Sequence, residues 1–335
     1  MRVSVVGCGA VSRSHLRVLS GMKNVKISSV VDIKKDRADT VAKKYKCKAY
    51  YNFETMLSED KPDCIHICTP HYLHVPMSVS ALNKGINVLC EKPCAISEEG
   101  LAQLRHAQSQ SDAVYGVCFQ NRYNESVKAI KKIIDKNTYG NIKSARAFVH
   151  WDRREDYYSD DWHGTIDKEG GGVVVNQAIH TQDLLRYLIS QDVTAVIAHV
   201  FNDHLKGAIE VEDTVQALLY YNDDTTALFN ATTAFSDNLP VMIDIICEKA
   251  TLRIEGDNAY IVRGSKIKKL HLKRKKLVIG KSYWGKGHFG LIRDFYDCLE
   301  KAKPFPIDAF EGGKAVEEFL SIYESSKTGE KIYLK

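Results

Sequence analysis

The first fifteen residues, MRVSVVGCGAVSRSH, constrain the fold more than any other segment of the chain. A valine-rich run typical of a buried strand stops at Gly7 and Gly9, and a helical pattern begins at Ala10. The next strand-like run, ISSVVD, ends on the acidic residue Asp32. A glycine turn between a strand and a helix, with an acid at the end of the second strand, is typical of a dinucleotide-binding βαβ unit.

The residues of the turn fit this interpretation. Gly7 permits a tight turn, and Gly9 lets backbone N–H groups approach a pyrophosphate at the positively polarised N-terminus of the helix. Ser12 stands where the motif usually has a third glycine or alanine, and it is small enough to keep the helix close to the strand. We therefore predict a cofactor-binding turn made of Gly7, Gly9, Ala10, Val11 and Ser12.

Asp32 favours NAD over NADP as the cofactor. Its carboxylate would accept hydrogen bonds from both hydroxyls of the adenosine ribose and would repel a 2′-phosphate. Lys34 and Lys35 follow it closely and argue in the opposite direction, because lysine pairs with phosphate. We predict NAD.

The pattern of apolar runs predicts two domains. Up to about residue 119, short apolar runs alternate with helical patterns, which is typical of an α/β fold with a doubly wound parallel sheet. Later runs such as TVQALLYYNDDTTALFNATTAF and MIDIICEKATLRIEGD, with turn-like NDD and EKA inside them, indicate antiparallel hairpins. We predict a Rossmann domain over residues 1–119 and an α/β domain with a large open, mainly antiparallel sheet over residues 120–335. The expected helices span residues 10–19, 36–45, 75–82, 98–108, 126–135, 177–188, 289–301 and 313–326.

Composition excludes several classes of protein. Of the 335 residues, 44% are hydrophobic and 27% charged, which is ordinary for a globular chain, and no run approaches the roughly 20 apolar residues of a membrane span. Nine scattered cysteines, an odd number, favour free thiols in a reducing cytoplasm. The net charge of +5 is mild, and nine basic residues are concentrated between Lys266 and Lys286, so nucleic acid is not an expected partner.

Five motifs in one order resemble a known family. GCGAVSRSH, ICTPHYLHVP, NVLCEKP, FQNRYN and GGGVVVNQAIHTQD are similar to segments of the glucose-fructose oxidoreductase, inositol 2-dehydrogenase and rhizopine-catabolism (Gfo/Idh/MocA) family, and the resemblance covers nearly the whole chain. It implies an NAD(P)-dependent oxidoreductase whose substrate, a sugar, a polyol or a sugar derivative, is held between the two domains. It also implies a homodimer or homotetramer that associates through the open sheet.

The resemblance assigns three catalytic residues. Lys92 matches the lysine of a Glu-Lys-Pro motif and should polarise the reacting oxygen. His180 matches the family histidine and should act as general base, since an ordinary histidine pKa of roughly 6.5 suits that role. Many relatives carry aspartate where this chain has Asn176, which can hydrogen-bond a hydroxyl or orient His180 but carries no charge. Asp183, one turn beyond, could orient the imidazole or simply face a neighbouring backbone.

The other predicted contacts come from the same motifs and from one aromatic loop. Asn121, Arg122 and Tyr123 follow the last strand of the first domain, where the family places contacts to nicotinamide and substrate, although they could equally form an interdomain hinge and a helix cap. Trp162 and His163 lie in a loop rich in aromatic residues that suits stacking on a sugar or a subunit contact. The cofactor residues are completed by Thr69, Pro70, His74, Glu91, Lys92 and Asn121, and the substrate residues are Lys92, Arg122, Tyr123, Trp162, His163, Asn176 and His180.

Metal binding is not predicted, although Cys64, His66, Cys68, His71 and His74 are closely spaced. Strand alternation places the first three on one buried face, and a paired C-x-x-C knuckle is lacking.

We predict an NAD-dependent sugar or polyol dehydrogenase that transfers hydride between nicotinamide C4 and a hydroxyl-bearing carbon. One alternative is a sugar-nucleotide dehydrogenase of the UDP-amino-sugar type, whose phosphates the basic residues 266–286 could contact. The other is a dinucleotide-sensing regulatory protein without turnover; Asn176 argues for it, while Lys92 and His180 argue against it.

Overall fold

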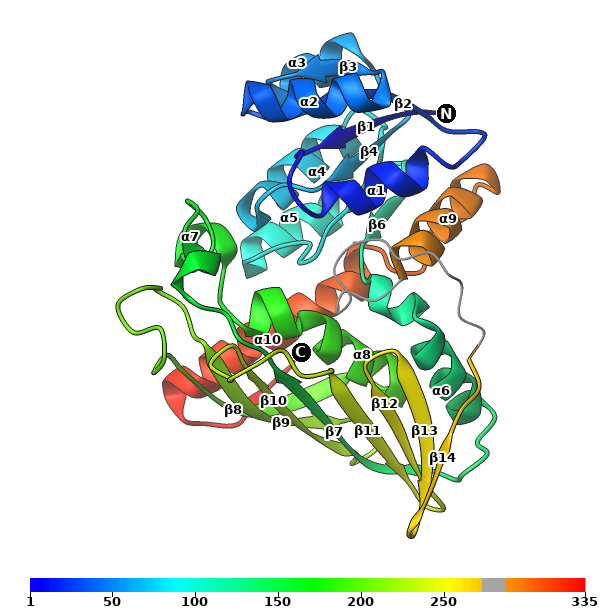
Figure 1. The fold of residues 1–335 in the computed structure, drawn as a ribbon, viewed down its shortest axis with the longest axis vertical. Coiled ribbons are helices and arrows are strands. Elements are labelled where there is room, and N and C mark those ends of the chain that lie inside the picture. Colours follow the sequence, from blue (N-terminus) through cyan, green and yellow to red (C-terminus); the bar gives the residue numbers. More distant parts are fainter. Residues whose placement is uncertain (273–286, 335) are drawn as a thin grey trace. The chain divides into compact units, whose positions relative to one another are not determined.

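The computed structural model describes residues 1–272 and 287–334, which form two compact units (Figure 1). The described residues of the first unit are 1–120 and 287–316, and those of the second are 121–272 and 317–334. The chain therefore returns to the first unit near its end, whereas the sequence pattern suggested a single boundary after residue 119.

The first unit is built on a six-stranded parallel sheet in the order β3-β2-β1-β4-β5-β6. This order confirms the predicted doubly wound sheet, and it reverses direction between β1 and β4, where such sheets bind their ligands. The strands are β1 (Arg2–Val6), β2 (Lys26–Val31), β3 (Lys48–Tyr50), β4 (Cys64–Ile67), β5 (Asn87–Cys90) and β6 (Tyr115–Val117).

Helices flank this sheet, and two of them begin with side-chain caps. Asn52 accepts a hydrogen bond from the Thr55 N–H, and Ser97 accepts one from the Gly100 N–H, so each cap satisfies a backbone donor that has no partner within its helix. Helix α9 packs beside α1 in the same unit. The helices are α1 (Ser12–Leu19), α2 (Lys35–Tyr45), α3 (Phe53–Glu59), α4 (His74–Leu82), α5 (Glu98–Ser109), α9 (Gly287–Glu300) and the first part of α10 (Ala309–Thr328).

The second unit contains a mixed sheet of nine described strands in the order β14-β13-β12-β11-β7-β10-β9-β8-β15. Every pairing is antiparallel except β7 with β10, which confirms a mainly antiparallel sheet. The strands are β7 (Ile142–His150), β8 (Val193–Phe201), β9 (Thr214–Tyr221), β10 (Thr226–Thr232), β11 (Met242–Cys247), β12 (Thr251–Glu255), β13 (Asn258–Arg263), β14 (Lys266–Lys269) and β15 (Ile332–Tyr333).

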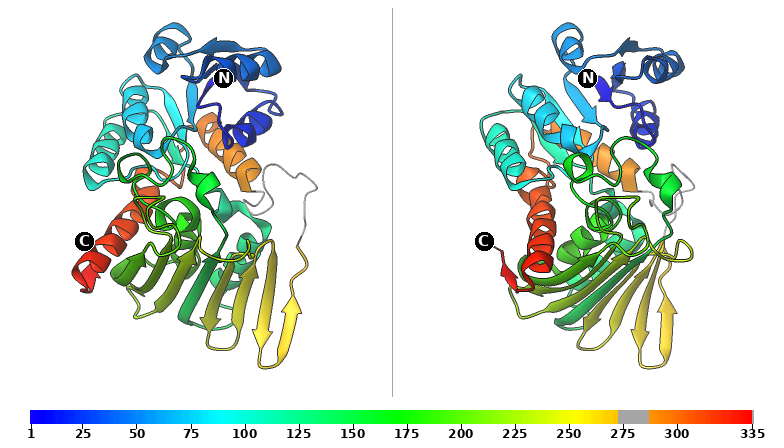
Figure 2. Two further views of the ribbon diagram at one scale, coloured as in Figure 1. Left: turned by 60° about the vertical axis from the view of Figure 1, so that its left-hand side comes forward. Right: turned by 90° about the vertical axis from the view of Figure 1, so that its left-hand side faces the viewer.

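One face of this sheet is covered and the other is open (Figures 1 and 2). Helices α6 (Glu125–Asp135) and α8 (Ile179–Ile189) pack on the covered face, and the end of α10 bonds to β8 through the Ser325 hydroxyl. The open face carries partly exposed apolar side chains, among them Ile197 and Leu228.

A short helix α7 (Ile166–Glu169) and a π-helical turn, Val174–Ala178, precede α8. The helix expected from residue 177 therefore starts as a wider turn. No described helix combines the length and the apolar composition that a membrane crossing requires. The nine cysteines all lie in the described part of the chain, and none forms a disulfide there. Of the basic stretch 266–286, residues 273–286 lie outside the described residues.

Candidate functional site

The glycine turn after β1 has the geometry that a pyrophosphate cradle requires. Gly7 adopts φ +89°, and a Cβ at this position would lie 2.5 Å from the carbonyl oxygen of Cys68, so only glycine fits. A Cβ at Gly9 would meet nothing within 4 Å, which leaves the backbone open to a ligand. Ser12 is buried and its hydroxyl donates to the Gly9 carbonyl oxygen at 2.7 Å. Ala10 is exposed and Val11 is half-buried.

Asp32 is held at the end of β2 by backbone amides. The N–H groups of Cys8 and Lys34 donate to its two carboxylate oxygens at 2.9 and 2.8 Å. The side chain remains half-buried, at the position where an acid meets an adenosine ribose. The open glycine cradle, the start of α1 and this carboxylate fit a dinucleotide.

His74 connects two of the predicted cofactor segments. Its Nδ1 lies 2.7 Å from the Pro93 carbonyl oxygen and its Nε2 lies 2.9 Å from the Thr69 carbonyl oxygen. The ring is fully buried, so it holds the turn after β4 against the Glu-Lys-Pro segment. Thr69, Pro70 and Lys92 are half-buried and keep some surface for a ligand.

Glu91 turns its side chain into the first unit. Its Oε1 lies 2.8 Å from Nε2 of His15, and the residue is 5% exposed. Burial would raise the pKa of this carboxyl, but its interactions with His15 and His288 hold the pKa well below its usual range. Sequence reasoning missed His15, although a histidine on the buried side of a predicted helix was a signal.

In the second unit, the glycines before α8 are packed against a buried acid. The Glu212 carboxylate accepts hydrogen bonds from the N–H groups of Gly172 and Val174 and from the Tyr323 hydroxyl, all within 3.0 Å. A Cβ at Gly172 would lie 1.9 Å from the Glu212 carbonyl oxygen, so this approach requires glycine. Burial raises the pKa of Glu212, and the backbone donors oppose that shift.

The side chains of Asn176 and His180 are more exposed than those of most of their neighbours in this segment. Among residues 171–189, only Asn176, His180 and Tyr187 are half-buried, while all others are buried. The structure places Asn176 in the π-helical turn and His180 in the first turn of α8.

Asn176 is anchored by residues that sequence reasoning missed. Its Nδ2 donates to Oε1 of Glu169 at 2.5 Å and lies 3.3 Å from the Tyr157 hydroxyl. Glu169 is fully buried and also accepts the Gly164 N–H. The carboxyl group that an aspartate would place at position 176 is therefore present one hydrogen bond further back, on Glu169.

The aromatic loop lies against this anchor. The rings of Trp162 and His163 have centroids 3.7 Å apart, and the His163 ring lies 4.9 Å from that of Tyr157. The His163 Nδ1 also lies 2.7 Å from a carboxylate oxygen of Asp160. The structure thus connects the two predicted loop residues to Asn176 through Tyr157.

The carboxylate of Asp183 is bound by two arginine side chains. Its carboxylate binds Nε and Nη2 of Arg122 at 2.8 and 2.5 Å, and Arg186 lies 3.3 Å away. Arg122 is 7% exposed, so this predicted substrate residue is engaged in a buried ion pair. Asn121 and Tyr123, on either side of it, are half-buried.

The five closely spaced cysteines and histidines do not form a ligand set in the described chain. His66 pairs with His15 and Tyr296, and His74 pairs with two carbonyl oxygens. One group of metal-type donors does converge elsewhere in the described residues, at His15, Glu91, Cys118 and His288.

Two family models match the chain. Residues 1–119 match the model described as "Oxidoreductase family, NAD-binding Rossmann fold", and residues 127–253 match the "GFO/IDH/MocA C-terminal domain". Glucose-6-phosphate 3-dehydrogenase of Bacillus subtilis (strain 168) is 27% identical over 212 residues, which are 61% of this chain and 59% of that protein. The chain thus matches less than two thirds of that relative's length.

Solved structures share the fold over the full chain. The WlbA dehydrogenase from Bordetella pertussis, in complex with NADH and UDP-GlcNAcA, matches with a TM-score of 0.87 and 25% identity, covering 100% of this chain and 99% of that one. Levoglucosan dehydrogenase, in complex with NADH and levoglucosan, matches with a TM-score of 0.90 at 18% identity and the same coverage.

Proposed function

Because the chain belongs to the GFO/IDH/MocA oxidoreductase family and has its NAD-binding domain, we propose that it is an NAD-dependent dehydrogenase of a sugar or sugar derivative. The observation that carries the proposal is that Asn176 and His180 are half-buried while the other residues from 171 to 186 are buried. Glu212 and Glu169 hold this segment in place, so the Asn176 and His180 side chains are pre-positioned for a ligand.

The proposed mechanism uses one residue from each unit. Lys92 donates a hydrogen bond to the reacting oxygen and stabilises the negative charge that develops there. His180 accepts the proton of the substrate hydroxyl. Bound NAD would supply nicotinamide C4 as the acceptor of hydride from the hydroxyl-bearing carbon. Gly7, Gly9 and Asp32 would hold the dinucleotide, and Asn176 would bond a substrate hydroxyl or orient His180.

A sugar nucleotide is the second candidate substrate. The dehydrogenase solved with UDP-GlcNAcA is 25% identical over the full chain, and strand β14 presents exposed lysines that suit phosphate groups. Screening free sugars, inositols, sugar phosphates and UDP-sugars for NADH formation at about 340 nm separates the two candidates. Binding of NAD without reduction by any of these compounds would favour a regulatory protein instead.

The carboxylate of Asp32 predicts tighter binding of NAD than of NADP. Exchanging it for asparagine (Asp32→Asn) removes the charge and should narrow the affinity ratio by about tenfold, the equivalent of about 1.4 kcal/mol. Calorimetric titration of both cofactors measures the ratio. Asp36→Asn, at an exposed acid on the next helix, is the matched control and should leave it unchanged. Equal affinity of the unmodified protein for both cofactors would show that Lys34 and Lys35 dominate.

The Asn176–Glu169 pair predicts a swap experiment. Asn176→Asp places a second carboxylate 2.5 Å from that of Glu169, so we expect at least about a tenfold loss of kcat. Combining it with Glu169→Gln restores one amide and one carboxylate and should recover most of the activity. The recovered enzyme should show the acid limb of its pH profile at higher pH, because the nearby negative charge raises the pKa of the His180 imidazole. Full activity and an unchanged profile in the single variant would contradict this arrangement.

A further inference from the structure

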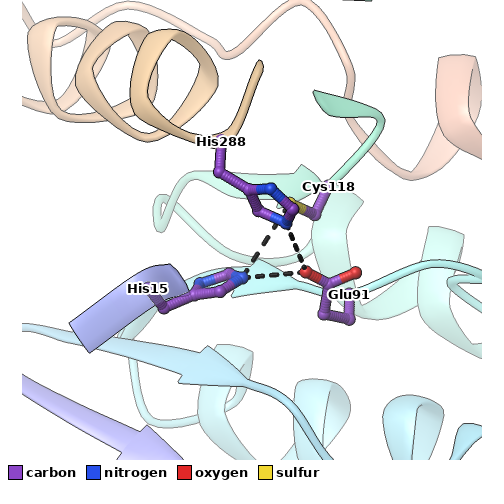
Figure 3. A group of neighbouring side chains, drawn as sticks. All are labelled: His15, Glu91, Cys118 and His288. Atoms are coloured by element: carbon purple, nitrogen blue, oxygen red, sulfur yellow. Dashed lines mark hydrogen bonds and ion pairs between the residues drawn. The ribbon is translucent and has the colours of Figure 1, made fainter. Parts of the chain in front are cut away.

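Four potential metal ligands converge inside the first unit (Figure 3). His15 lies on α1, Glu91 follows β5, Cys118 follows β6, and His288 lies in the first turn of α9. Their ligand atoms all lie within 4.8 Å of one another. His15 and Cys118 are 0% exposed, His288 is 3% exposed and Glu91 is 5% exposed, so the cluster is closed to solvent.

The spacing of the ligand atoms is close to that of a tetrahedral zinc site. The Glu91 Oε1 lies 2.8 Å from Nε2 of His15 and 3.5 Å from Nε2 of His288, and the Cys118 Sγ lies 4.0 Å from Nε2 of His15. Zn–N and Zn–O bonds near 2.0 Å and a Zn–S bond near 2.3 Å imply ligand separations of about 3.3 to 3.6 Å. The observed distances lie on both sides of this range, and the shortest would open by about 0.5 Å around an ion.

The donor set also matches zinc in its chemistry. Two imidazoles, a thiolate and a carboxylate are zinc ligands, whereas calcium and magnesium prefer oxygen alone. The thiolate and carboxylate together balance the two positive charges of Zn²⁺, so the buried site would be neutral. The Nε2 of His288 makes no hydrogen bond with any described residue, although it points at the Glu91 carboxylate.

A second layer of hydrogen bonds orients the His15 ring. The Nδ1 of His15 lies 2.8 Å from Nδ1 of His66, whose Nε2 lies 3.0 Å from the Tyr296 hydroxyl. When His15 donates from Nδ1 to His66, its Nε2 lone pair points into the cluster. Ligating histidines in metal sites commonly bond a partner through the other ring nitrogen in this way.

We propose that His15, Glu91, Cys118 and His288 bind one Zn²⁺ as a structural site. Four protein ligands leave no open coordination position, so the ion takes no part in hydride transfer. It would fasten the start of α9 to the ends of β5 and β6 and would fix Glu91, the residue before Lys92. Binding replaces the thiol proton of Cys118, which is released to the buffer. This inference does not depend on the proposed dehydrogenase activity.

Metal content and cobalt spectroscopy test the site directly. Full-length protein purified from zinc-supplemented culture should contain one zinc per chain by mass spectrometry. Protein refolded with Co²⁺ in place of zinc should show the visible bands of tetrahedral cobalt and a sulfur-to-cobalt charge-transfer band. Refolding is used because a closed cluster exchanges metal slowly.

Two alanine variants supply the comparison. Cys118→Ala should lose the charge-transfer band and at least about 100-fold in zinc affinity, while Cys94→Ala, at an equally buried thiol outside the cluster, should retain both. His66→Gln should weaken zinc binding about 10- to 100-fold. Unmodified protein that holds no more zinc than Cys118→Ala, or that gives no sulfur band, would overturn the proposal. The cluster would then be a metal-free hydrogen-bonded core around Glu91.

Discussion

Lys92→Ala is expected to lower kcat by about 10³-fold or more, because it removes the cation proposed to stabilise charge on the reacting oxygen. Removing a single well-placed donor of this kind typically costs about 10²- to 10³-fold, and here the positive charge is lost as well. NAD affinity should change little, since Gly7, Gly9 and Asp32 are untouched. Steady-state rates and calorimetric NAD binding, measured on the same protein, separate the two effects.

Lys84→Ala provides the matched control, at an exposed lysine of the same unit. It should leave both kcat and NAD affinity unchanged. Lys92→Arg keeps a positive charge but presents it as a wider, planar group, so it should recover only part of the rate. A Lys92→Ala enzyme with unaltered kcat would remove this residue from the mechanism.

His180→Ala is expected to lower kcat by about 10²- to 10⁴-fold, the usual cost of losing a positioned general base. The pH dependence of the remaining activity should lose the limb that reports the imidazole, because no group then takes the proton near neutral pH. Added imidazole should restore part of the rate if space is left where the ring stood. NAD affinity should be retained, since the predicted pyrophosphate contacts belong to the other unit.

His199→Ala, at an exposed histidine of β8, is the control for this variant and should behave like the unmodified protein. Unmodified turnover with the same pH profile in His180→Ala would show that another residue is the base. Asp183 is a poor replacement because Arg122 and Arg186 hold its carboxylate, so Tyr123 would be the next candidate.

The strand, turn and acid of the predicted cofactor site follow from local sequence. The positions of Gly7, Gly9 and Asp32 follow from a strand, a turn and a helix that are consecutive in the chain, and the structure has each where the pattern placed it. Such a turn requires a backbone conformation that glycine adopts more easily than other residues, so the glycines in the sequence indicate it directly. Strand β3 and helix α3 were missed because three strand residues and a largely polar seven-residue helix give no clear periodicity.

The hydrogen-bond partners of the segment that carries the predicted catalytic residues could not be predicted from local sequence. Glu169 and Tyr157 anchor Asn176, and Glu212 holds the glycines before α8 from 38 to 40 residues away in the chain. Spacing rules recognise partners within a turn or a strand, whereas these contacts form because the β7–α8 segment folds back on itself and on the start of β9.

By itself, the sequence determined the two sheet types, the family and the glycine turn predicted to hold NAD, because each depends on residues that are close together in the chain or on motifs kept in order. Only the tertiary structure decided which side chains share a buried space. In the folded chain Asp183 bonds Arg122 and Arg186. The side chains of His15, Glu91, Cys118 and His288, which come from four separate parts of the first unit, lie close together. The physical reason is that a buried polar group without a hydrogen-bond partner costs free energy. Buried polar side chains therefore pair with whichever groups the fold places next to them, independently of their separation in sequence.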